Sequence, residues 1–132
     1  MQFAGIRFTA RLLILALALA PCGAAQSDDE GRAQQHFEAA RAAEKAGDLE
    51  RAVSEYQQVL KLMPGVPEVQ TNLGLAYYMM GRNDEAIDVF EKALKSKPDL
   101  LGANLFLGMS YLRTNRYEKS IEPLKKALAL NE

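Results

Sequence analysis

The sequence has few residues of the types that carry catalysis or bind metals. Its 132 residues include one cysteine, one histidine and no tryptophan. No serine or cysteine accompanies His36 in a nucleophile motif, and neither an HExxH zinc motif nor a glycine-rich phosphate loop occurs. We therefore expect a protein that is not an enzyme and that uses no cofactor or metal, with His36 as a partly packed helix residue.

An excess of charge of either sign is also missing. Lysine and arginine total 16 against 17 aspartate and glutamate residues, so the formal net charge is -1. Because nucleic acids and anionic membranes attract strongly basic surfaces, this balance predicts neither as a partner. The longest unbroken apolar run, Leu12 to Ala20, covers nine residues, whereas a membrane-spanning helix needs about 20.

The first 25 residues have the pattern of a secretory signal peptide. Two arginines are the only charged residues, the apolar run follows, and a proline and small residues come after it. We expect cleavage after Ala25, with cleavage after Ala24 as the alternative. The protein is then exported to the periplasm or the extracellular space, and residues 26–32 form a short polar leader.

Cys22 offers a second way of processing this segment. Leu19-Ala20-Pro21-Cys22 resembles the box of bacterial lipoproteins, in which cleavage precedes the cysteine and the cysteine is acylated. The residue before that cysteine is normally small, whereas proline lacks the amide N–H and has a fixed φ. Lipidation of Cys22 is therefore the minor alternative, and we expect contact with a membrane only if Cys22 is acylated.

Beyond the leader, the sequence repeats with a period of 34 residues. The stretch Pro67 to Leu100 contains two apolar patterns of helical spacing, separated by Gly81 and closed by Pro98. Three kinds of position recur at this period: a helix break at Gly47, Gly81 and Asn115, a small residue at Ala52, Ala86 and Ser120, and a large side chain at Tyr56, Phe90 and Leu124. A helical hairpin of this size cannot bury its apolar faces alone, so several hairpins must stack.

This pattern resembles the tetratricopeptide repeat family. The family places Leu-Gly, Tyr, Ala, Phe, Ala and Pro at set offsets, which here are Leu73-Gly74, Tyr77, Ala86, Phe90, Ala93 and Pro98; a second run has Leu107-Gly108, Tyr111 and Ala127. The resemblance covers Ala33 to Glu132. The position where the family often has tryptophan holds His36, Gln70 and Asn104.

The resemblance implies an all-α fold, with three helix-turn-helix repeats in a short right-handed superhelical solenoid. The expected organisation is a signal peptide at 1–25, a leader at 26–32, and repeats at 33–66, 67–100 and 101–132, without a C-terminal capping helix. The expected core includes Leu73, Tyr77, Ala86, Phe90, Ala93, Leu107, Tyr111 and Leu124. Pro123 lies about six residues into the last helix, which must therefore start late or bend there.

The resemblance also implies protein binding, because the first helices of such repeats line a concave groove that holds peptides or partner chains. One known mode clamps a terminal carboxylate with Lys, Arg and Asn side chains. The corresponding positions here are Phe37, Arg41, Asn72, Gly102 and Phe106. Only Asn72 matches in type, so we do not expect this mode.

The groove positions of this sequence are charged in the first repeat and mostly apolar afterwards. Glu38, Arg41 and Lys45 give the charged end. The expected partner-binding residues are Asn72, Leu75, Tyr78, Met79, Leu105, Met109 and Leu112. Flexible methionine side chains suit an adaptable peptide surface, and Asn72 is expected to hydrogen-bond the partner's backbone. Leu75, Leu105 and Leu112 have an equal alternative, which is to pack between neighbouring first helices.

The expected function is a non-catalytic scaffold for a protein or peptide partner. Two alternatives are an N-terminal repeat module of a longer exported protein, including an enzyme, and a lipid-anchored subunit of an envelope assembly. The last repeat adds a further expectation, because its apolar positions show no polar replacement at Leu105, Phe106, Ile121, Leu124 and Leu128. An exposed apolar end predicts either a longer repeat array or self-association end to end through this surface.

Overall fold

The computed structural model describes residues 25–131, with side chains described from residue 27 onward. Within that range the chain forms helices joined by short turns and contains no β-strand. The helices are α1 (Ala25–Ala46), α2 (Leu49–Leu62), α3 (Pro67–Met79), α4 (Asn83–Ser96), α5 (Leu101–Arg113) and α6 (Tyr117–Leu130).

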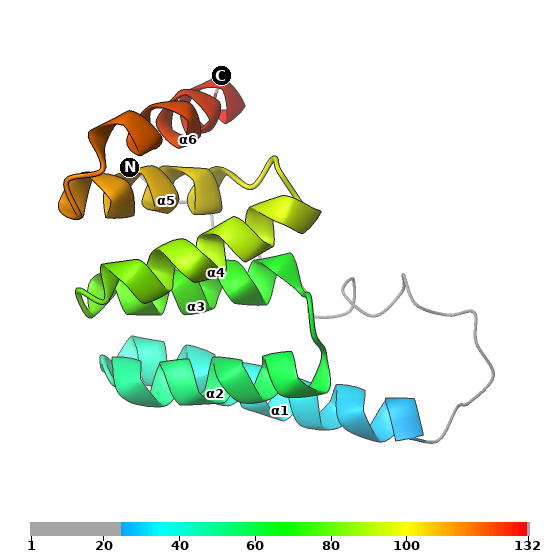
Figure 1. The fold of residues 1–132 in the computed structure, drawn as a ribbon. Coiled ribbons are helices and arrows are strands. Elements are labelled where there is room, and N and C mark those ends of the chain that lie inside the picture. The colour runs from blue at the N-terminus through cyan, green and yellow to red at the C-terminus, as the bar shows by residue number, and fades with distance from the viewer. Residues whose placement is uncertain (1–24, 132) are drawn as a thin grey trace.

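The helices stack as three hairpins, α1–α2, α3–α4 and α5–α6 (Figure 1). The second helix of each hairpin packs on the first helix of the next, and α3 also contacts α5 directly. The stack therefore places the first helices α3 and α5 side by side, whereas α1 meets the second repeat through α2. The expectation of an all-α fold with three helical repeats is confirmed.

The turns inside the hairpins are made by residues in the left-handed backbone region. Gly47, Gly81 and Asn115 have φ values of 76°, 76° and 59°, as their shared phase predicts. Asp48 follows the first of these turns and caps α2, since its side chain accepts a hydrogen bond from the Arg51 amide at 3.1 Å.

The first helix is longer than the sequence pattern predicts. Residues 26–32 are expected to form a leader, but α1 begins at Ala25 and includes them. Polar composition shows that a segment is solvated, and a solvated segment can be helical. No proline interrupts this one, Asp28 lies favourably in the first turn, and Arg32 pairs with Asp29 at 3.2 Å one turn away. The leader is therefore a polar extension of the first repeat.

Proline 123 does not delay the last helix. α6 begins at Tyr117 and continues through Pro123 to Leu130, so the alternative of a late start is wrong. The ring removes one amide donor, and the carbonyl it leaves without a partner belongs to Lys119. Because Lys119 is exposed, water can bond that carbonyl.

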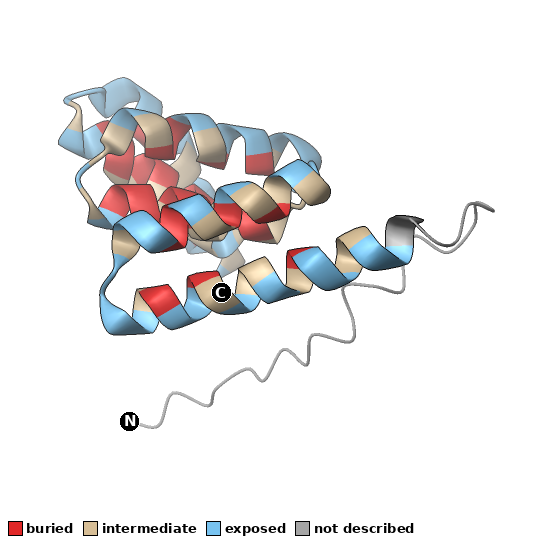
Figure 2. Cartoon of the chain, turned by 90° about the horizontal axis from the view of Figure 1, so that it is seen from below, coloured by how far each residue is buried: buried red, intermediate tan, exposed pale blue. Residues whose placement is uncertain are grey.

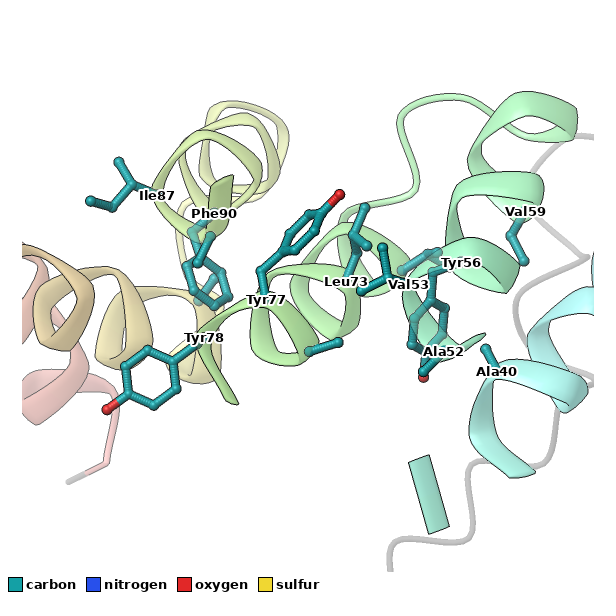
Figure 3. Packing of buried hydrophobic residues seen from close by; sticks show 14 of the residues in the cluster. Ala40, Ala52, Val53, Tyr56, Val59, Leu73, Tyr77, Tyr78, Ile87 and Phe90 are labelled. Carbon is teal, nitrogen blue, oxygen red and sulfur yellow. The ribbon is translucent and has the colours of Figure 1, made fainter. Parts of the chain in front are cut away.

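The core lies between the helices, where buried positions follow the sides that face neighbouring elements (Figure 2). Its recurring unit is a large side chain of a second helix over a small residue of the first helix. In repeat 1 these are Tyr56 and Ala40, both fully buried, and Figure 3 shows the Tyr56 ring beside Ala40. Seven of the eight expected core residues are buried: Leu73, Tyr77, Ala86, Phe90, Ala93, Leu107 and Tyr111. Leu124 is only partly buried.

No helix among the described residues is long and apolar enough to cross a membrane. The expected signal peptide and Cys22 lie outside the described residues, apart from Ala25. The two proposed cleavage sites and the lipidation alternative therefore stay predictions.

Candidate partner-binding surface

The expected binding residues lie on two neighbouring helices. Four are on α3 and three on α5, and we call them together the first-helix surface: Asn72, Leu75, Tyr78, Met79, Leu105, Met109 and Leu112. On α5, Leu105, Met109 and Leu112 follow one another at intervals of four and three residues, so they form one stripe along the helix. Asn72, Leu75 and Met79 form a corresponding stripe on α3, at intervals of three and four.

Three of these side chains are open to solvent. Met79 is 61% exposed, Leu112 41% and Leu105 37%. Leu75 and Met109 are partly buried and pack against the core cluster. Leu75 therefore contributes to the core, whereas Leu105 and Leu112 present apolar area to solvent.

Tyr78 differs from the expectation of an accessible aromatic ring. It is 6% exposed, and its ring centroid lies 5.1 Å from that of Phe106 on α5. Figure 3 shows the ring pointing from α3 toward the third repeat. Its hydroxyl lies 4.0 Å from the Met109 sulfur, within the longer hydrogen-bond range of sulfur. Tyr78 thus joins repeats 2 and 3 and is the buried member of the first-helix surface, which packs against its neighbours on α5.

Arg113 is the residue that the sequence pattern missed here. Its guanidinium carbon lies 3.7 Å from the centroid of the Tyr78 ring, and its Nη1 donates to the Tyr78 carbonyl at 3.0 Å. It therefore stacks on the ring and adds a second hydrogen bond to a carbonyl in the last turn of α3 that already accepts one from the Gly81 amide. In the sequence, a basic residue in the last turn of a helix is explained by its favourable interaction with the dipole of that helix. Nothing further in the sequence indicates that Arg113 contacts the preceding repeat.

Repeat 1, which has the charged groove positions, contains a buried tyrosine, Tyr56. Phe37 meets the Tyr56 ring edge-on, with centroids 5.9 Å apart. The Tyr56 hydroxyl is buried and completes no hydrogen bond with any described residue. Burial, reinforced by the carboxylate of Glu44, raises the pKa of Tyr56, and Arg41 and Asn72 act on it in the opposite direction. Tyr56 therefore stays neutral at physiological pH.

Two of the three positions where the family often has tryptophan make polar side-chain contacts, and the third, Gln70, has a buried atom without one among the described residues. His36 is partly buried and its Nδ1 lies 2.6 Å from Glu55 Oε2 on α2, which fits the expected packed helix residue. Asn104 donates to the carbonyls of Pro98 and Leu100 at 2.9 Å each, closing the turn between repeats 2 and 3. The Gln70 Oε1 atom is buried without a hydrogen-bond partner in the described part of the chain.

Partly exposed ion pairs connect neighbouring elements of the second and third repeats. Lys97 donates to Glu68 at 2.6 Å, and Arg116 pairs with Asp84 at 2.8 Å. Partial burial acts to raise the pKa of Glu68, but the hydrogen bond from Lys97, a backbone hydrogen bond and the charge of Lys97 together outweigh it, so the pKa falls below its ordinary value. Between residues 25 and 131, no group of three or more His, Cys, Asp or Glu side chains is placed to hold a metal ion.

Three solved structures with the same architecture match most of this chain. The crystal structure of MamA matches with a TM-score of 0.71 and 25% identity over 75% of this chain and 58% of that chain, so this chain spans less than two thirds of it. The second domain of Spaghetti (RPAP3), bound to an HSP90 peptide, gives 0.75 and 18% over 80% and 97%. The TPR2B domain of yeast Sti1, in a complex with pHsp70, gives 0.71 and 20% over 76% and 80%.

No curated protein sequence matches this chain. The tetratricopeptide repeat family model matches residues 37–100 and 81–132, which together cover most of the chain and both complete hairpins at its C-terminal side. The expected resemblance is therefore confirmed on sequence and on structure. The chain belongs to the tetratricopeptide repeat family.

Proposed function

We propose that the protein is an exported, non-catalytic scaffold that binds an extended partner segment on its first-helix surface. One observation carries this proposal: Met79, Leu105 and Leu112 are exposed apolar side chains on two neighbouring first helices, which the buried Tyr78 ring joins through its contact with Phe106. Exposed apolar area concentrated on one face usually marks an interaction site. The peptide complex of the RPAP3 domain and the pHsp70 complex of Sti1 add support from the same fold.

The chemistry of the surface favours a partner segment with apolar side chains. Met79 is unbranched and polarizable, so it can adapt to different side chains. Asn72 is partly exposed, and its amide can pair with one backbone N–H and one carbonyl of an extended chain. We do not propose recognition of a terminal carboxylate, since Asn72 alone matches the residues of that mode.

Selection from a phage-displayed library of random peptides tests this function. The purified protein should enrich peptides with apolar residues, and a Met79→Ser, Leu112→Ser double variant should bind the selected peptides about tenfold more weakly. The control is Ile121→Ser, Leu128→Ser, which also removes two exposed apolar side chains but from α6. Equal binding by wild type and by the first-helix variant would refute the proposal.

Export is the second part of the proposal and rests on the signal-peptide pattern of residues 1–25. The intact mass of the native mature protein tests it. A chain that begins at Gln26, or at Ala25, supports export without lipidation. An acylated chain that begins at Cys22 supports the lipid-anchored alternative, and a larger mass supports the module of a longer protein.

We further propose that the outer face of α6 is an association surface. Ile121 is 48% exposed and Leu128 is 65% exposed. Ile87 occupies the position of Ile121 in the preceding repeat, where the next hairpin follows, and it is only 4% exposed. A helix in the position that α5 takes on α4 would cover them, supplied by a following repeat or by a second copy. Sedimentation of residues 26–132 tests this surface, and a soluble monomer at tens of micromolar would contradict it.

A further inference from the structure

One side of each second helix in the stack contacts the repeat that follows it. On α4 this side contains Asp84, Ile87, Glu91 and Leu94. Asp84 pairs with Arg116 at 2.8 Å, and Glu91 accepts a hydrogen bond from the Tyr111 hydroxyl, so both acids join α4 to the third repeat. Ile87 is buried between them, and Leu94 packs against the core cluster.

The first repeat uses the same positions. Gln57 lies one period before Glu91, and its Nε2 donates to the Tyr77 hydroxyl of the second repeat at 2.9 Å. Val53 lies one period before Ile87 and is also buried. The corresponding residues of the last helix, which we call the α6 face, are Glu118, Ile121, Lys125 and Leu128.

All four residues of the α6 face are exposed, because α6 lies at one end of the stack (Figure 1). Ile121 and Leu128 therefore present to solvent the apolar area that their counterparts on α4 place against α5. A face of this kind is an interface without its partner. Whatever covers it must bring apolar side chains of its own.

A second copy docked head to tail does not meet that requirement. Helices α3 and α5 each have a small or apolar residue, Val69 and Ala103, buried in the stack. The residue at the same position of α1 is Gln35, which is exposed. A head-to-tail copy would press this amide against Ile121 or Leu128, and burying a polar group without a hydrogen-bond partner is unfavourable. Two α6 faces that meet each other match apolar area with apolar area.

The charges of the α6 face suit such a symmetric contact. Glu118 and Lys125 are seven residues apart, about two helical turns, and Ile121 lies between them. When two α6 helices run antiparallel about a two-fold axis near Ile121, each Glu118 lies opposite the partner's Lys125. Lys125 also pairs with Glu122 in its own helix at 3.6 Å, but their side chains are 71% and 85% exposed, and such a pair contributes little.

The other second helices do not have this arrangement of charge. At the two positions α2 has Glu50 and Gln57, and α4 has Asp84 and Glu91. An antiparallel pair of α4 faces would set acid against acid. Opposite charges at these positions therefore distinguish α6 from the second helices whose faces are covered by a following repeat.

We propose that the α6 face binds the α6 face of a second copy of this chain, in an antiparallel two-fold arrangement. Ile121 meets the partner's Ile121 near the axis, and Glu118 and Lys125 form two ion pairs across the interface. The inference rests on the association surface proposed above for α6 and selects its occupant. The contact uses no residue of the first-helix surface, so each copy can still bind a partner segment.

Exchange of the two charges tests the proposal by sedimentation of the purified protein. The wild type should form dimers at tens of micromolar. Glu118→Lys and Lys125→Glu should each weaken the dimer about tenfold, because each sets like charges opposite one another twice. An equimolar mixture of the two variants should regain the wild-type affinity, since every charge of one variant then faces the opposite charge of the other. The double variant should regain it alone.

Two further variants control for charge and for folding. Asp88→Lys and Lys92→Glu make the same changes on the exposed side of α4 and should leave the dimer unchanged. Ile121→Ser with Leu128→Ser should abolish the dimer, while its helix content and its binding of selected apolar peptides stay those of the wild type. Loss of peptide binding in that variant would show that the α6 face is not separate from the first-helix surface.

The outcomes separate this inference from the proposed function. Oligomers that keep growing with concentration would show head-to-tail contacts and overturn the two-fold arrangement. A dimer that persists in both charge variants, or a mixture that associates no better than its components, would also overturn it and leave α6 as an association surface. A monomeric wild type would remove both the dimer and that surface, whether or not a larger intact mass showed a following segment in its place.

Discussion

The ring of Phe90 fills the place that a Cβ atom on Gly74 would occupy. A Cβ built on Gly74 would lie 2.6 Å from Phe90 Cε1, and on Gly108 it would lie 2.5 Å from Leu124 Cγ. Helices α3 and α4 can approach this closely only because the first helix has no side chain there. The glycine of the Leu-Gly pair thus lets the large side chain of the second helix pack directly against the first helix in repeats 2 and 3.

Gly74→Ala should therefore destabilise the protein, although alanine favours a helix by about 1 kcal/mol. Overpacking a buried ring costs about 1–3 kcal/mol, which exceeds that gain. Gly102→Ala is the matched control on α5, because its new methyl group would meet only Thr71 Cγ2 at 3.7 Å. Chemical denaturation should show a loss for Gly74→Ala and a small gain for Gly102→Ala; the same sign for both would disprove the argument.

Phe90→Ala should cost about 3–5 kcal/mol of unfolding free energy, since Phe90 is fully buried. Leu128→Ala removes a large apolar side chain that is 65% exposed, and it should change stability by less than about 0.5 kcal/mol. Thermal melts of both variants check the ranking. A loss under about 1 kcal/mol for Phe90→Ala would contradict the core assignment.

Much of the fold could be predicted from the sequence because its signals are local and repeated. Gly47, Gly81 and Asn115 each adopt a left-handed backbone, and their spacing of 34 residues gives the repeat period without any knowledge of contacts. The burial of Tyr78 could not be predicted in this way. Helical spacing places Tyr78 near one side of α3, but Phe106 and Arg113 close over it from the next repeat.

The start of α1 and the surroundings of Tyr56 also could not be predicted from local patterns. Composition marks residues 26–32 as solvated and carries no information on whether a solvated segment is helical. Tyr56 shares its repeat position with Phe90 and Leu124, so a comparison of the repeats treats it as an apolar residue and does not single out its hydroxyl. Its surroundings depend on Glu44 from α1 and Asn72 from α3, which only the packed structure brings together.

Alkaline pH should weaken the fold through its buried phenols. Burial, with the hydrogen bond to Glu91, raises the pKa of Tyr111 to about 12. An unfolded tyrosine ionises near pH 10, so between about 10 and 12 the unfolded state binds fewer protons and stability falls as pH rises. Denaturation across this range should show that fall, and Tyr111→Phe should reduce its slope. An unchanged slope in Tyr111→Phe would show that Tyr111 does not cause the loss of stability.

Removing the Arg113 side chain should loosen the junction of repeats 2 and 3. Arg113→Ala loses a stacked guanidinium and the hydrogen bond to the Tyr78 carbonyl, together about 1 kcal/mol. Arg116→Ala breaks an exposed pair with Asp84 and should cost less than about 0.5 kcal/mol. Amide exchange should accelerate in the last turn of α3 in the first variant only; equal effects would contradict a specific role for Arg113.

The last prediction separates the exposed residues of the first-helix surface from the residue that supports it. Met79→Ser with Leu112→Ser removes side chains that are 61% and 41% exposed, so binding of selected apolar peptides should fall about tenfold while the melting temperature changes little. Tyr78→Ala should instead lower the melting temperature, because the ring is buried against Phe106. Titration calorimetry and melts on the same samples measure both effects. If Tyr78→Ala left stability intact, or if the double variant unfolded the protein, the division between contact and support proposed for this surface would be wrong.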